Sequence, residues 1–275
     1  MGYPIFFSDL DQTMIYSTRQ IAKHNDDLKK QILVESYNGK PISYMTKDAL
    51  AKLEEISQVY LFVPTTTRTL DQYNRIDFGK HVFASHAITT NGGRIVDNGE
   101  EDKQWTKNTV DLISSQGVEP AKALEELNAL IESSSDVVKN HIIKVRSADN
   151  FFNYLVTDLS VERPDSFVEE LKVKAEEWNY VMSFQSTKIY FIPKVLTKER
   201  AALEIMERAD CIESVAAGDS FLDIGLMAAA DYGIRPRHGE IESLPGVDKF
   251  AVTERKGIYA AEEILDFVER KFERR

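Results

Sequence analysis

The stretch that decides the fold is Ile5-Phe6-Phe7-Ser8-Asp9-Leu10-Asp11-Gln12-Thr13, in a chain of 275 residues. An apolar run of strand-forming residues leads directly into two aspartates and a threonine, which predicts a buried parallel strand with carboxylates at its C-terminal end. Open α/β sheets bind their ligands at that end. Because two neighbouring carboxylates repel each other unless a cation lies between them, Asp9 and Asp11 indicate a divalent metal site. The alternative for such a pair taken alone is a solvated turn.

Three further segments follow in a definite order and favour the metal site over the turn. A second apolar strand over 59–63 leads into Pro64-Thr65-Thr66-Thr67-Arg68. Lys198 opens a predicted helix after a predicted strand over 188–192, and a last apolar strand ends in Val215-Ala216-Ala217-Gly218-Asp219-Ser220. The strands over 59–63 and 215–217 therefore end in polar residues, as the first strand does.

Together these segments resemble the four sequence motifs of the haloacid dehalogenase superfamily of phosphotransferases, which use an aspartate nucleophile. The matches occur in the family's order and cover positions 9 to 223. The matched residues are Asp9, Asp11 and Thr13 in Asp-x-Asp-x-Thr, Thr66 at the end of the second strand, Lys198 in the third motif, and Gly218, Asp219 and Asp223 in Gly-Asp-x-x-x-Asp.

Two positions depart from the family pattern. The second motif often continues with Gly-Arg, whereas here Thr67 stands in the glycine place before Arg68. A β-branched residue at that place crowds the backbone beside the phosphate site. Many relatives with this cap arrangement carry Asn-Asp in the fourth motif, and here the pair is Leu222-Asp223, which removes one amide from the surroundings of the metal. Neither change removes a residue to which the resemblance assigns direct contact with phosphate or metal.

The resemblance implies a chemical role for each catalytic residue. Asp9 is expected to attack phosphorus and form an aspartyl phosphate. Asp11 is expected to protonate the leaving alkoxide and then to activate the water that hydrolyses the intermediate. Thr66 is expected to donate a hydrogen bond to a phosphoryl oxygen, and Lys198 to neutralise the charge on the phosphoryl group.

The resemblance also implies a Mg²⁺ cofactor and a set of substrate contacts. Mg²⁺ is expected to bind the Asp9 carboxylate, the backbone carbonyl of Asp11 and Asp219, while Asp223 is expected either to bind the ion directly or to support its ligands from behind. The stretch Asn91-Gly92-Gly93 indicates first of all a turn between strands, and in relatives of the Cof and sucrose-phosphatase type a similar stretch lies beside the substrate. The candidate substrate contacts are Thr13, Thr67, Arg68, Asn91 and Gly92.

The predicted fold class is α/β, with a doubly wound parallel-sheet core of the Rossmannoid, haloacid dehalogenase type and an inserted α+β cap domain. The core is expected to comprise 1–93 and 188–275, with a hairpin near 32–45 around Asn38-Gly39. Residues 94–187 are expected to form the cap, because helical periodicity there alternates with short strands. An insertion at this place resembles the larger, C2-type cap of sugar-phosphate phosphatases and phosphomannomutases.

Composition limits the classes of function. A chain with 43% hydrophobic residues can bury a full core, and its net charge of −11 argues against a nucleic-acid partner. The single Cys211 excludes an internal disulfide, and the five histidines show no zinc-ligand spacing. The apolar run Ile5-Phe6-Phe7 is far too short for a signal segment or a membrane span. We therefore expect a cytoplasmic monomer or homodimer whose partner is a small phosphorylated metabolite, with no membrane association.

Three functions remain open from the sequence. The first is a Mg²⁺-dependent phosphatase for a small phosphorylated metabolite, with a sugar phosphate favoured by the cap type. The second is a phosphomutase of the phosphomannomutase type, which needs a second phosphate site in the cap. The third is a binding or regulatory protein with weak catalysis, and the complete set of catalytic residues counts against it.

Overall fold

The strand β1 (Pro4–Ser8) lies at the centre of a parallel sheet in the order β15-β14-β13-β1-β5. The computed structural model describes residues 2–185 and 187–273. The side chains from Ile5 to Ser8 are fully buried, as expected for a parallel strand covered on both faces. The other strands of this sheet are β5 (Leu61–Pro64), β13 (Glu213–Ala217), β14 (Tyr232–Arg235) and β15 (Ala251–Val252).

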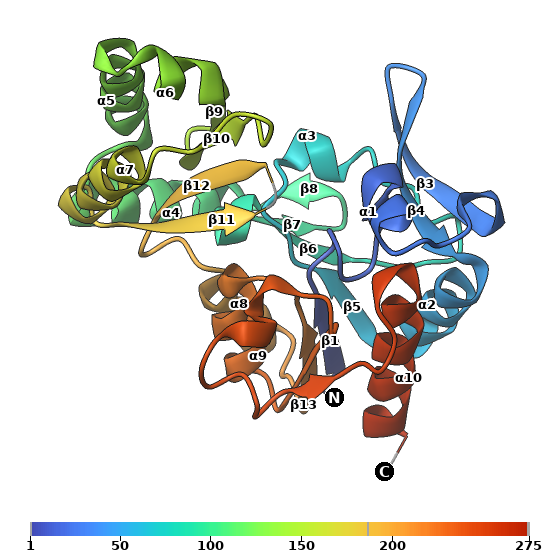
Figure 1. Cartoon of the computed structure of the whole chain (residues 1–275). Helices are drawn as coiled ribbons and strands as arrows, with labels where there is room; N and C mark the ends of the chain where they lie inside the picture. The colour runs from blue at the N-terminus through green and yellow to red at the C-terminus, as the bar shows by residue number, and fades with distance from the viewer. Residues whose placement is uncertain (1, 186, 274–275) are drawn as a thin grey trace. The chain divides into compact units, whose positions relative to one another are not determined.

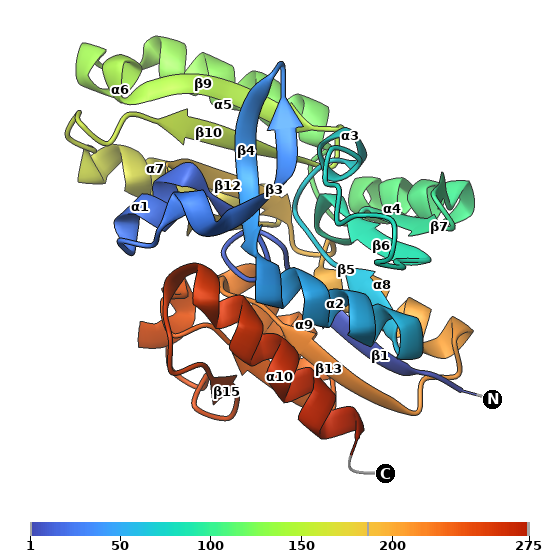
Figure 2. The ribbon, with the colours of Figure 1, turned by 90° about the vertical axis from the view of Figure 1, so that its right-hand side faces the viewer.

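Helices cover both faces of this sheet, so the predicted doubly wound α/β core is confirmed (Figures 1 and 2). The helices α2 (Lys47–Val59) and α10 (Ala260–Phe272) lie side by side on one face, and Phe6 packs in the hydrophobic cluster that they share. The helices α8 (Lys198–Arg208) and α9 (Ile224–Ala229) lie on the opposite face (Figure 1). Thr46 caps α2 through a hydrogen bond from the Ala49 N–H to its hydroxyl oxygen.

A small antiparallel sheet adjoins the C-terminal end of β5. It contains β6 (His86–Thr89), β7 (Arg94–Asp97) and β8 (Glu100–Glu101), and a parallel bridge joins Thr65 to Ile88. The short helices α3 (Leu70–Tyr73) and η2 (Thr90–Gly92) flank it.

The predicted hairpin is confirmed as β3 (Gln31–Tyr37) and β4 (Lys40–Thr46), which pair in antiparallel register (Figure 2). Asn38 and Gly39 both have positive φ, 50° and 71°, as a two-residue type I′ turn requires. The short strand β2 (Tyr16–Ser17) adds to β4. Between β2 and β3 lie α1 (Thr18–Lys23) and η1 (Leu28–Lys30).

The second compact unit is an antiparallel sheet in the order β11-β12-β10-β9 with helices packed on one face. Its hydrophobic cluster includes Leu127 of α5, Leu171 of α7, and Leu155 and Phe191 of the sheet. Its helices are α4 (Lys103–Gln116), α5 (Pro120–Ser133), α6 (Asp136–His141) and α7 (Asp165–Glu177). Its strands are β9 (Ile142–Ala148), β10 (Phe152–Thr157), β11 (Tyr180–Gln185) and β12 (Lys188–Pro193).

The boundaries between the two units differ from those expected from the sequence. The core unit comprises Met1–Asp102 and Lys198–Arg275, and the cap unit comprises Lys103–Thr197. Residues 94–102 belong to the core because β7 and β8 continue the sheet begun by β6. Residues 188–197 belong to the cap because β12 pairs with both β10 and β11.

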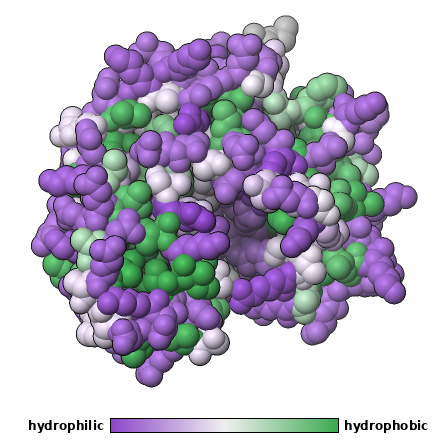
Figure 3. Space-filling view, turned by 90° about the horizontal axis from the view of Figure 1, so that it is seen from above, coloured by the Kyte–Doolittle hydropathy of each residue, from purple (hydrophilic) through white to green (hydrophobic). Residues whose placement is uncertain are grey.

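The helices of the described residues are too short or too polar to cross a membrane. On the face drawn in Figure 3, hydrophilic side chains surround smaller groups of apolar ones.

Candidate active site

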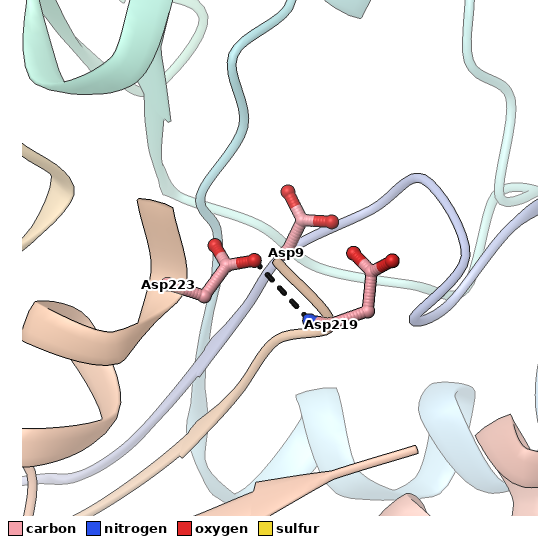
Figure 4. A group of neighbouring side chains, drawn as sticks. All are labelled: Asp9, Asp219 and Asp223. Atoms are coloured by element: carbon pink, nitrogen blue, oxygen red, sulfur yellow. Dashed lines mark hydrogen bonds between the residues drawn. The ribbon is translucent and has the colours of Figure 1, made fainter. Parts of the chain in front are cut away.

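Three buried carboxylates meet at the C-terminal end of the parallel sheet (Figure 4). Asp9 follows β1, and Asp219 follows β13 after one glycine, while Asp223 ends the short helix η3 (Phe221–Asp223). Because Ser8 pairs in register with Ala217, the residues that follow these two strands emerge side by side. One oxygen from each carboxylate lies within 4.8 Å of the other two.

Backbone donors hold Asp223 in this position. Its Oδ2 accepts hydrogen bonds from the N–H groups of Asp219 (3.2 Å) and Ser220 (2.9 Å) and from the Ser220 hydroxyl (2.8 Å). A Cβ atom on Gly218 would lie 2.2 Å from the Cβ of Asp223, so only glycine leaves room for this carboxylate. The Gly-Asp-x-x-x-Asp spacing therefore has a packing reason as well as a chemical one.

Lys198 bridges two of the three carboxylates. Its Nζ donates to Asp9 Oδ1 and to Asp223 Oδ1, each at 2.6 Å, and its side chain is 1% exposed. Burial by itself lowers the pKa of Lys198, but the two carboxylates outweigh it and raise that pKa above its ordinary value. A lysine in the first turn of a helix opposes the helix dipole, and here the carboxylates of Asp9 and Asp223 compensate for this placement.

The electrostatics of the cluster favour a bound cation. Burial, followed by the neighbouring carboxylates Asp223 and Asp11, raises the pKa of Asp9 to about 7 even though Lys198 opposes the shift. Burial and the same kind of repulsion raise the pKa of Asp219 well above its ordinary value. One lysine thus leaves the three carboxylates short of positive charge. Buried carboxylate oxygens are the ligands of hard divalent cations, so the donor set fits such an ion.

The first-motif residues divide between this cluster and a neighbouring ion pair. Thr13 donates from its hydroxyl to Asp9 Oδ2 at 3.5 Å. Among the described residues, the group of side chains that could hold a metal ion consists of Asp9, Asp219 and Asp223. The side chain of Asp11 instead accepts two hydrogen bonds from Arg68, from Nε at 2.7 Å and from Nη2 at 2.9 Å. A contact of the Asp11 carbonyl with a metal stays a prediction.

The second motif and the Asn-Gly-Gly stretch lie against each other. The N–H of Arg68 donates to the hydroxyl oxygen of Thr66 at 3.1 Å, which leaves the hydroxyl proton of Thr66 to donate elsewhere. The N–H of Asn91 donates to the Thr66 carbonyl at 3.0 Å. Asn91 and Gly92 have φ values of 56° and 93°, as the predicted turn requires. Thr67 is half-buried, and substrate contacts by these residues stay predictions.

Comparison with known proteins identifies the fold. No protein-family model and no curated protein sequence matches the chain. The sucrose-phosphatase of Synechocystis sp., solved with sucrose and phosphate, aligns with TM-score 0.64 and 16% identity over 98% of this chain and 99% of its own. A sugar phosphatase of haloacid dehalogenase subclass IIB aligns with TM-score 0.56 and 14% identity over 98% and 99%. The IMP-nucleotidase of Plasmodium falciparum aligns with TM-score 0.56 and 10% identity over 98% and 68%.

The chain has the haloacid dehalogenase fold. The resemblance carried by the four motifs is thereby confirmed at the level of fold. Within the core unit of this haloacid dehalogenase fold, the structure brings together Asp9, Lys198, Asp219 and Asp223, which lie far apart in the sequence.

Two residues of the site have no signal in the sequence. The Gln12 amide donates to Asp219 Oδ2 at 3.0 Å, and Gln12 itself has a φ of 65°. His238 supports this strained position, because its Nδ1 accepts from the Gly257 N–H at 3.2 Å and its Nε2 therefore donates to the Gln12 carbonyl at 3.0 Å. Burial lowers the pKa of His238 to about 4, so the ring is neutral. Each contact spans a sequence separation that no local pattern reveals.

Proposed function

We propose that the protein is a Mg²⁺-dependent phosphatase that hydrolyses a phosphate monoester of a small metabolite through an aspartyl phosphate on Asp9. The single observation that carries the proposal is the buried Asp9 carboxylate, held at 2.6 Å by Lys198 within a cluster of three carboxylates at the C-terminal edge of the sheet. A buried carboxylate that is fixed in this position, within a group that could hold a metal ion, is suited to nucleophilic attack on phosphorus.

The residues around Asp9 can orient its carboxylate and stabilise the negative charge of the phosphoryl group. The Asp9 carboxylate is oriented by Lys198 at Oδ1 and by Thr13 at Oδ2. Lys198 can share its charge with the phosphoryl oxygens as the bond to Asp9 forms, and the Thr66 hydroxyl proton can donate to one of them. Mg²⁺ held by Asp9, Asp219 and Asp223 would neutralise further negative charge on the phosphoryl group.

Asp11 supplies the proton in this proposal. Its side chain is 47% exposed, in contrast to the buried Asp9. In its protonated form Asp11 can give a proton to the leaving oxygen, and the carboxylate that results can take one from the incoming water.

We propose a sugar phosphate as the substrate class. Support comes from the fold shared with a sucrose-phosphatase and a subclass IIB sugar phosphatase. The cap sheet also carries suitable chemistry on the face opposite α5 and α7: the Lys188 Nζ lies 5.2 Å from the ring centroid of Tyr154 and 5.7 Å from that of Tyr190. Aromatic rings beside a cation are well suited to a sugar and its phosphate.

Phosphate release from a panel of substrates tests the function. The panel contains sugar phosphates, nucleotides and cofactor phosphates, each assayed with Mg²⁺ and with EDTA. We expect metal-dependent release concentrated on the sugar phosphates. Release concentrated on nucleotides would support the phosphatase function but overturn the proposal that the substrate is a sugar phosphate. No release from any member, with the protein folded, would overturn the proposal in favour of a mutase or a binding role.

Metal stabilisation is expected to depend on pH. The pKa of Asp9 is raised from 3.8 to about 7, and that of Asp219 shifts in the same direction, so the folded metal-free protein binds protons that the unfolded chain releases. Its stability therefore falls as pH rises from about 4 to about 7. Mg²⁺ replaces these protons, so the gain in Tm on changing EDTA for Mg²⁺ should be larger at pH 8 than at pH 5. Equal gains at both pH values, or an undiminished gain in Asp219→Asn, would contradict this site.

A further inference from the structure

A buried glutamate on the hairpin lies behind the Arg68–Asp11 ion pair. Glu35 of β3 has a side chain that is 1% exposed, although it carries a charge. Its Oε2 accepts from the Ser43 hydroxyl at 2.7 Å and from Arg68 Nη1 at 2.9 Å. Its Oε1 lies 3.4 Å from Arg75 Nε, and the Arg75 guanidinium stacks on the ring of Tyr37 at 4.5 Å. The hairpin register shifts on both sides of Glu35, which directs this one carboxylate inward.

Arg68 is held between two carboxylates of different kinds. Its side chain is 11% exposed, with Nη1 on the buried Glu35 and with Nε and Nη2 on the half-exposed Asp11. A guanidinium is planar and rigid, so fixing one nitrogen fixes the directions of the other two. Glu35 therefore sets where Arg68 points, and Arg68 sets where the Asp11 carboxylate lies.

We propose that Glu35 is a positioning residue for proton transfer: through Arg68 it holds the Asp11 carboxylate in place for the leaving oxygen. The inference rests on the proposed phosphatase function. It gives the hairpin a part in the reaction, although Glu35 lies outside the four motifs. It also assigns Arg68 a second role, the positioning of Asp11, besides the predicted contact with substrate. Three nitrogens of Arg68 already bind Asp11 and Glu35.

A purely structural role for Glu35 predicts a different result from a positioning role. If Glu35 only anchors the hairpin, its loss should affect every substrate alike. If it positions the proton donor, its loss should matter most where the leaving group needs a proton. An alkoxide leaving group needs one, whereas p-nitrophenolate leaves without it.

The test is to compare Glu35→Gln with wild type on glycerol phosphate and on p-nitrophenyl phosphate. Glutamine keeps the shape of the side chain and removes its charge. We expect kcat to fall about 10- to 100-fold on glycerol phosphate and to stay within about threefold on p-nitrophenyl phosphate, with KM little changed on both. The matched control is Glu262→Gln, because Glu262 is also a buried glutamate paired with an arginine, Arg255, at 2.9 Å. We expect the control to behave like wild type on both substrates.

Each outcome decides one of the two proposals. Equal losses on the two substrates would overturn the positioning role and leave the phosphatase intact. A wild-type protein that releases phosphate from neither substrate would instead count against the proposed function. If Glu35→Gln does not fold, Glu35→Asp provides the test, because aspartate keeps the charge but its shorter side chain cannot hold Arg68 Nη1 in the same geometry. The same selective loss on glycerol phosphate is expected there, and a uniform loss would overturn the inference.

Discussion

An Asp9→Asn variant is expected to lose at least about 10⁴-fold in kcat, because removal of a nucleophile leaves only binding and electrostatic assistance. The amide is nearly isosteric, so the fold should survive, and Lys198 keeps Asp223 as a partner at 2.6 Å. Rapid quenching of the wild type with labelled substrate should trap a hydroxylamine-sensitive phosphate on the protein. The variant should show none.

The matched control is Asp111→Asn, which removes an exposed carboxylate whose only expected loss is a weak ion pair with Lys107 at 3.6 Å. It should keep wild-type turnover and stability. Wild-type-like turnover in Asp9→Asn would exclude the aspartyl phosphate. Turnover lost together with the cooperative thermal transition would show a folding defect, and the trapping result on the wild type would then decide the mechanism.

Contacts set by the ends of strands could be predicted from the sequence. Asp9 and Asp219 follow apolar runs that become β1 and β13, and parallel strands bring their C-terminal ends to one edge. Lys198 could be predicted as well, since a lysine that opens a helix needs a nearby anion. The hairpin turn followed from Asn38-Gly39, because few other pairs adopt two positive φ values.

Contacts between distant side chains could not be predicted in this way. From the sequence alone, Glu35 would be expected to face solvent, as most charged residues on strands do. Only the irregular register of the hairpin directs its side chain inward. Gln12 and His238 meet across most of the chain. Helix α4 has a weak signal in the sequence, because its buried stripe is narrow and includes the polar Thr109 between Trp105 and Ile113.

The domain boundaries expected from the sequence differ from those of the structure for a related physical reason. The periodicity of β12 is that of any buried strand, so the sequence does not tell which sheet it joins. Its antiparallel pairing with β10 and β11 places it in the cap. Likewise β7 and β8 follow the Asn-Gly-Gly turn and pair back toward β6, which keeps them with the core.

A Lys198→Met variant is expected to lose both stability and turnover. Methionine fills much of the same volume, but it leaves Asp9 and Asp223 buried without their shared cation. Breaking a buried ion pair from one side typically costs about 3–5 kcal/mol, and we expect a loss of that order in EDTA. Turnover should fall at least about 10²- to 10³-fold, the range typical of removing one group that stabilises charge in the transition state.

Mg²⁺ should reduce the difference in stability between Lys198→Met and wild type, because a bound cation supplies part of the charge that Lys198 no longer provides. Thermal unfolding of both proteins in EDTA and in Mg²⁺ measures this difference. The matched control is Lys194→Met, since Lys194 is exposed. The control should be wild-type-like in both media. Lys198→Met should stay nearly inactive even where Mg²⁺ restores most of its stability, because a bound ion would not replace the N–H donors that Lys198 places beside Asp9. A variant equal to wild type in EDTA would show that the two 2.6 Å contacts do not stabilise the protein, and restored turnover in Mg²⁺ would remove Lys198 from the catalytic set.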